Sequence, residues 1–161
     1  MTLKIGQQAP DFTLPATDYE TISLQGLKGQ TVVLYFYPKD DTPGCTAEAC
    51  EFRDNFNALK AQGITVLGMS KDSVKSHDKF KEKYKLNFPL LADEKGDTLN
   101  AYNVWVEKSM MGRKYMGIDR STFLIDGTGK IARIWRNVKV AGHVAEVTAA
   151  AQKLQQQSKA A

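Results

Sequence analysis

Residues 31–45 read T-V-V-L-Y-F-Y-P-K-D-D-T-P-G-C, and the architecture of the chain can be worked out from this stretch. Its first seven residues are rich in β-branched and aromatic side chains without strict alternation, which is typical of a strand buried on both faces. Pro38 ends that strand. Beyond Pro38 the spacing of the apolar residues changes to that of one helix face, with Ala49, Phe52, Phe56 and Leu59. Gly63 should end this helix.

The rest of the chain repeats this change of period. Strands are predicted at residues 11–14, 21–24, 64–69, 88–91, 121–125 and 131–135. A helix capped by Ser73 should run to residue 84, and a short one should cover 98–102. The last helix is marked by Val144, Val147, Ala151 and Leu154, with a tail that we expect to fray from about residue 155. We expect a long loop at residues 103–119.

The order of these elements predicts the fold class. The early strand–helix–strand units require parallel strands joined by right-handed crossovers. The run D-G-T-G at residues 126–129 instead predicts a hairpin, and therefore antiparallel strands. We expect an α/β protein, a three-layer sandwich with a mixed central sheet and helices on both faces. This is the thioredoxin-like arrangement, here in a single domain over residues 1–161.

Composition and charge exclude several classes of protein. With 42% hydrophobic and 25% charged residues the chain resembles an ordinary globular protein, not a disordered one. The longest apolar run, residues 32–37, is too short to span a membrane, and residues 1–14 hold no apolar stretch of signal-peptide length. We therefore expect a cytoplasmic protein. The net charge is +4, but the lysines of residues 71–85 alternate with acidic residues, which favours a solvated helix face over a nucleic-acid site.

The chain has two cysteines, Cys45 and Cys50, in the spacing C-x4-C. In a reducing compartment a close pair is more often catalytic or metal-binding than structural. The spacing matches neither the C-x2-C of thioredoxin-type motifs nor half of a zinc ribbon. His77 and His143 are distant in sequence from the cysteines and from each other, so we predict no metal site.

Cys45 lies where the buried strand gives way to the helix. A helix N-terminus presents unpaired N–H groups and about half a positive charge, which stabilises a thiolate. Lowering a cysteine pKa by about two units requires about 2.7 kcal/mol, and a helix end supplies up to about 2 kcal/mol. Arg120, at the start of a predicted core strand, is the obvious supplementary cation. The alternatives are an inert buried thiol for Cys45 and a simple helix N-cap for Thr42.

Residues 38–45, P-K-D-D-T-P-G-C, resemble the peroxiredoxin pattern P-x-x-x-T-x-x-C, and the continuation T-A-E-A-C at 46–50 is similar to the Q-type subfamily, also called bacterioferritin comigratory protein. Residues 6–12 and 105–126 resemble the same subfamily. The similarity spans residues 5 to about 140 in matching order, while the C-terminal helix matches in type only.

The resemblance implies a role for each matched residue in reducing hydrogen peroxide and organic hydroperoxides. Cys45 would be the peroxidatic cysteine, which becomes a sulfenic acid. Thr42 would donate a hydrogen bond to the peroxide, and Arg120 would hold both thiolate and peroxide. Pro38 would shield the site from water, and N–H groups near Gly44 and Cys45 would bind the second peroxide oxygen. Glu48 would orient Arg120, an exposed helical glutamate being the alternative.

The same resemblance implies how the enzyme is recycled. Cys50 would be the resolving cysteine, forming an intramolecular disulfide with Cys45 that prevents overoxidation. Thioredoxin or a glutaredoxin-type dithiol protein would reduce that bridge. No haem, flavin or metal is needed. Because the bridge requires no partner subunit, we expect a monomer.

Two other functions compete with the peroxidase. One is a thiol–disulfide oxidoreductase acting on protein disulfides, whose usual C-x2-C is absent here. The other is a redox-sensing binding module, for which the methionines at 110, 111 and 116 could form a partner surface.

Overall fold

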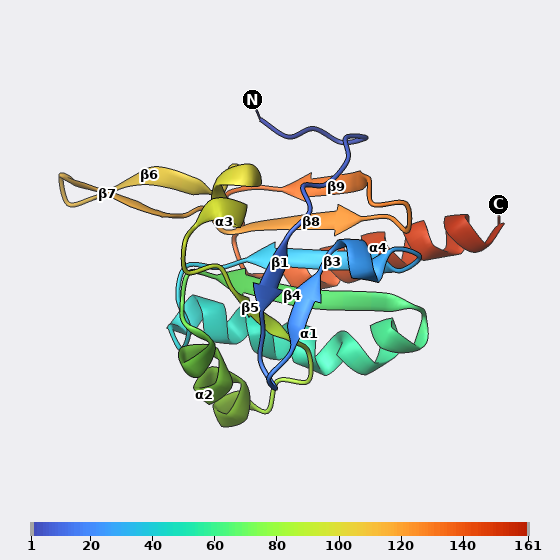
Figure 1. Ribbon diagram of the computed structural model, residues 1–161, viewed down its shortest axis with the longest axis horizontal. Coiled ribbons are helices and arrows are strands. Elements are labelled where there is room, and N and C mark those ends of the chain that lie inside the picture. Colours follow the sequence, from blue (N-terminus) through green and yellow to red (C-terminus); the bar gives the residue numbers. More distant parts are fainter. Residues whose placement is uncertain (1, 161) are drawn as a thin grey trace.

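The computed structural model describes residues 2–160, with side chains to residue 158, and its centre is a five-stranded sheet of order β5-β4-β3-β8-β9 (Figure 1). The central strand β3 (Thr31–Phe36) pairs in parallel with β4 (Ile64–Ser70), which pairs in parallel with β5 (Leu90–Ala92). On its other side β3 pairs antiparallel with β8 (Ser121–Ile125), and β8 with β9 (Ile131–Trp135). The predicted mixed sheet is confirmed.

Each face of the sheet carries its own apolar core. One face packs against α1 (Pro43–Ala61), α2 (Val74–Tyr84) and α4 (His143–Ala160). The other is covered by the N-terminal segment, the short pair β1 (Thr13–Pro15) and β2 (Thr21–Ser23), the 3-10 turn η1 (Gln25–Leu27) and α3 (Asp97–Ala101). All six residues of β3 are buried, because neighbouring strands and both layers surround this strand.

Residues 103–119 do not form the long loop that the sequence predicts. They form an antiparallel hairpin of β6 (Trp105–Met110) and β7 (Arg113–Ile118), which projects from the body of the protein (Figure 1). Its two-residue turn is Met111-Gly112, both at positive φ, as a tight hairpin requires. Most of its side chains are exposed, so no buried face imposes the apolar–polar alternation by which strands are recognised.

The helix ends follow local chemistry. Ser73 caps α2 as predicted, its side chain accepting a hydrogen bond from the N–H of Ser76. The α4 helix continues past Gln155 to Ala160, and fraying of its last turns stays a prediction. Within residues 2–160, no helix combines the length and apolar character needed to cross a membrane.

Candidate active site

The N-terminus of α1 begins in the way the residues require. Pro43 is the first helical residue, where its missing N–H costs nothing, and Thr42 before it has an extended backbone with φ −100° and ψ 156°. The Thr42 hydroxyl donates to the Lys39 carbonyl at 2.8 Å and makes no side-chain cap to the helix. Thr42 therefore occupies the N-cap position without capping through its side chain, and its hydroxyl holds the turn that precedes the helix.

Cys45 lies in the first turn of α1 and is 1% exposed. The Arg120 guanidinium donates from Nη2 to the Cys45 Sγ at 3.3 Å. The strand register explains this contact across 75 residues, because Ser121 pairs with Phe36 and so places Arg120 beside the end of β3. The Arg120 carbonyl in turn accepts from the N–H of Val138. The cation predicted to supplement the helix N-terminus therefore lies against the sulfur.

Glu48 shares Arg120 with Cys45. Arg120 Nη1 donates to Glu48 Oε1 at 2.7 Å, and the Glu48 side chain is fully buried. Burial raises the pKa of Glu48 to about 7, although the charge and hydrogen bond of Arg120 act to lower it. Burial acts to lower the pKa of Arg120, but the charges of Glu48 and Cys45, with hydrogen bonds to both, raise it above its ordinary value. The alternative of an exposed helical glutamate is wrong.

Gly44 leaves room for the guanidinium. A Cβ at this position would lie 3.2 Å from Arg120 Nη2, tighter than an ordinary contact. Glycine therefore lets Arg120 approach the first turn of α1 closely. Pro38, which follows the buried Tyr37, is exposed, and its shielding role stays a prediction.

Cys50 lies farther along the same helix and is partly buried, and both cysteines are free thiols. In a regular helix, residues five apart are rotated by about 140°, with Cα atoms about 8.7 Å apart. A disulfide needs less than about 7 Å and converging Cβ atoms. The structure therefore brings Arg120 and Glu48 to Cys45 but leaves Cys50 out of bonding reach.

A second polar cluster, which the sequence analysis missed, lies next to this site. A carboxylate oxygen from each of Asp40 and Asp72 and a ring nitrogen of His77 all lie within 4.8 Å of one another. A signal was present, because His77 falls on the inner side of the predicted helix and a buried imidazole needs polar partners. Its partners, however, are fixed only by the folded chain.

A buried thiol at a helix N-terminus, contacted by an arginine on a thioredoxin-like sheet, defines a thiol-based redox enzyme. The model of the AhpC/TSA family matches residues 5–134, and the chain belongs to this family. It is 56% identical over 147 residues to a putative peroxiredoxin, bcp, of Coxiella burnetii, covering 91% of this chain and 97% of that one. It is 51% identical over 146 residues to the peroxiredoxin Bcp of Bacillus subtilis, covering 91% and 93%.

Solved structures agree with the sequence relatives. A peroxiredoxin Q variant of Xylella fastidiosa superimposes with a TM-score of 0.89 at 39% identity, covering 98% of this chain and 99% of that one. Peroxiredoxin Q of Xanthomonas campestris gives 0.85 at 41% identity, covering 89% and 91%. The chain is thus a peroxiredoxin, a thiol-dependent peroxidase that takes a peroxide and a thiol reductant. Family membership favours this activity over the two alternatives raised by the sequence.

Proposed function

We propose that the chain reduces hydrogen peroxide and organic hydroperoxides through a sulfenic acid at Cys45. The observation that carries this proposal is the contact of Arg120 with both the Cys45 sulfur and the buried Glu48 carboxylate. A similar protein, the bacterioferritin comigratory protein of Xanthomonas campestris, is described with alkyl peroxide reduction activity. We extend that substrate class to this chain.

In the first step the Cys45 thiolate attacks the terminal oxygen of the peroxide. A sulfur–oxygen bond forms and the oxygen–oxygen bond breaks, so sulfur is oxidised to sulfenic acid while the departing oxygen takes a proton and leaves as alcohol or water. Arg120 and the N–H groups near Gly44 and Cys45 stabilise charge that moves onto the departing oxygen. Thr42 turns its hydroxyl from the Lys39 carbonyl to donate to the bound peroxide, and Pro38 limits access of water. Glu48 holds one edge of the guanidinium so that the other faces the reacting atoms.

In the second step Cys50 attacks the Cys45 sulfur. A disulfide forms and the sulfenic oxygen leaves as water, which protects Cys45 from further oxidation. Because both cysteines lie in one regular helix, the first turns of α1 must unwind for the sulfurs to meet. Unwinding also brings the bridge to the surface. We infer that a dithiol protein of the thioredoxin or glutaredoxin type then reduces it, in the cytoplasm, and that the enzyme works as a monomer without a cofactor.

A coupled assay tests this function. Purified protein is given hydrogen peroxide with thioredoxin, thioredoxin reductase and NADPH, and NADPH oxidation is followed for the wild type and for Cys45→Ser and Cys50→Ser. We expect turnover only with both cysteines present. Turnover by Cys45→Ser at the wild-type rate would refute the assignment, and replacing thioredoxin by glutaredoxin and glutathione distinguishes the two kinds of reductant.

A further inference from the structure

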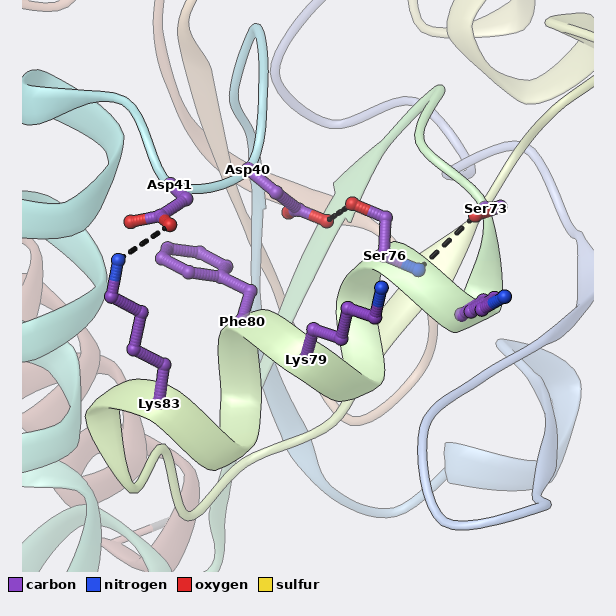
Figure 2. A pocket seen from close by; sticks show the side chains of 8 residues that line it. Asp40, Asp41, Ser73, Ser76, Lys79, Phe80 and Lys83 are labelled. Carbon is purple, nitrogen blue, oxygen red and sulfur yellow. Dashed lines mark hydrogen bonds and ion pairs between the residues drawn. The ribbon is translucent and has the colours of Figure 1, made fainter.

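The loop that leads into the active site, residues 38–42, is fastened to the body of the protein through Asp40. This carboxylate accepts from Tyr37 Oη at 2.6 Å and from Ser76 Oγ at 2.7 Å, and its other contact is His77 Nδ1 at 2.7 Å. The Asp40 backbone N–H donates to Asp72 Oδ2. Figure 2 shows Asp40 directed toward Ser76 on α2. The Asp40 side chain therefore joins the loop to α2, and its backbone N–H joins the loop to Asp72.

The contacts of His77 fix the orientation of its ring. His77 is fully buried, and its Nε2 is 2.8 Å from the Leu91 carbonyl, which can only accept, so Nε2 carries a proton. Its Nδ1 lies 2.7 Å from Asp40 Oδ2 and 3.3 Å from Tyr37 Oη. Burial first, and then the negative charge of Asp40, raise the pKa of Tyr37 well above its ordinary value, so the phenol stays protonated and donates. These contacts form a buried hydrogen-bonded cluster of Tyr37, Asp40 and His77.

Asp41 makes a second and weaker attachment. Its backbone is left-handed, with φ 57°, and its carboxylate accepts from Lys83 Nζ at 2.8 Å (Figure 2). The same carboxylate accepts from Tyr84 Oη, also at 2.8 Å. Lys83 and Asp41 are substantially exposed, and exposed pairs contribute little. The loop and α2 also line a cleft of about 580 Å³, so the loop is not packed under a further layer here. The Asp40 contacts are therefore the main attachment of the loop.

The position of this attachment matters for the reaction. Thr42 follows Asp40 by two residues, and the N–H groups of the first turn of α1 follow directly, so the loop fixes the groups that face the peroxide. The same first turns must unwind for Cys45 to reach Cys50. The Asp40 contacts therefore lie at the boundary between the loop, which keeps its position, and the start of α1, which unwinds.

We propose that Asp40, held by His77, is a positioning residue that fixes the peroxide-binding loop and forms the stationary end of the segment that unwinds when Cys45 bonds to Cys50. The proposal rests on the proposed function, because it concerns the two steps of that reaction. It predicts that the two steps respond differently when the attachment is lost. Attack on peroxide needs the loop in place, whereas unwinding does not.

Stopped-flow measurement separates the two steps. One rate constant describes oxidation of Cys45 by hydrogen peroxide, and the other describes closure of the disulfide. We expect Asp40→Ala to slow the first by about tenfold or more, because a misplaced reacting group is that costly, and to leave the second unchanged or faster. Asp40→Asn should restore most of the first rate, since its amide oxygen accepts from Tyr37 Oη and its amide N–H donates to Nδ1 of His77.

A matched control separates positioning from general stability. Asp93 is also a buried aspartate, but its carboxylate accepts from the N–H of Leu99, away from the loop. Asp93→Ala should lower the melting temperature without changing the ratio between the rate constants for Cys45 oxidation and disulfide closure. If Asp40→Ala changes both rates alike, or if Asp40→Asn is as slow as Asp40→Ala, the proposal is wrong. Should Asp40→Ala fail to fold, Ser76→Ala removes one hydrogen bond to Asp40 and should give the same split on a smaller scale.

Hydrogen exchange on the unaltered protein tests the stationary end directly. In the disulfide form residues 38–42 should keep the protection they have in the dithiol form, while residues 44–50 lose theirs. Loss of protection across both segments would overturn the proposal. Failure of the proposed function gives a different result, because the wild type would then form no sulfenic acid at all.

Discussion

At the scale of single residues, one arginine serves two acidic groups. Arg120 donates to the Cys45 sulfur and to the Glu48 carboxylate, and all three lie at least partly out of water. Electrostatic interactions are stronger in such surroundings than at the surface. In the proposed reaction the same contact would stabilise charge on the thiolate and then on the departing oxygen.

Replacing Arg120 separates these two effects. We expect Arg120→Met to slow the reaction with peroxide even at a pH high enough to ionise the Cys45 thiol. Rate constants measured across a range of pH provide the comparison. If raising the pH restores the wild-type rate, Arg120 controls only ionisation and takes no part in the transition state.

Glu48 gives the fold a pH dependence whose sign follows from its raised pKa. Between pH of about 4.5 and about 7 the folded protein keeps a proton on Glu48 that the unfolded chain has lost. Stability from this group is therefore present below about pH 4.5 and lost as the pH rises through about 7, a change of about 3 kcal/mol. We expect the stability of wild type relative to Glu48→Gln to fall by this order between pH 5 and 8, measured by urea unfolding. An equal difference at both pH values would contradict the assignment.

At the scale of elements, α1 has two tasks that conflict. As a regular helix it places Cys45 against Arg120, and as the same regular helix it keeps Cys50 away. Its first turn contains Gly44 and Thr46, both poorer helix formers than alanine. The beginning of this helix is therefore suited to unwind.

Oxidation should remove helical hydrogen bonds from α1. We expect the disulfide form to have less far-UV helical signal and faster hydrogen exchange within residues 44–56 than the dithiol form. Phe52, now fully buried, or its neighbours should become exposed. Unchanged protection across this segment, with the bridge between Cys45 and Cys50 confirmed by mass spectrometry, would show that the helix does not unwind.

The elements that could be predicted from sequence are those with a buried face. The apolar run of β3 and the recurring Ala49, Phe52, Phe56 and Leu59 of α1 are legible because burial imposes their patterns. The β6–β7 hairpin has few buried side chains, and its Met-Gly turn is not a strong hairpin signal. Asp40 and His77 are 37 residues apart in sequence, so local periodicity cannot predict their contact. The contact of Arg120 with Cys45 agrees with the sequence prediction, and the roles proposed for the two residues come from the family pattern.

At the scale of the whole molecule, the sheet divides the core in two. Cys45 and Phe52 belong to the cluster shared by α1, α2 and α4, while the opposite cluster involves the N-terminal segment and α3. Unwinding the start of α1 therefore disturbs one face and leaves the other packed. This arrangement allows a local rearrangement without loss of the fold.

The position of the proposed disulfide within one chain predicts the state of association. Because the proposed disulfide lies within one chain, light scattering should give the mass of a single chain for both the dithiol and the disulfide forms. A covalent dimer that appears on oxidation and disappears on reduction would show that the cysteines pair between chains.

The division of labour between the two cysteines is the central claim, and one measurement tests it most directly. Cys45→Ser and Cys50→Ser are each treated with one equivalent of hydrogen peroxide in the presence of dimedone, and their intact masses are recorded. The account predicts a single dimedone adduct, located at Cys45, on Cys50→Ser and no adduct on Cys45→Ser. An adduct at Cys50 on Cys45→Ser, or equal failure of both variants to react, would contradict it.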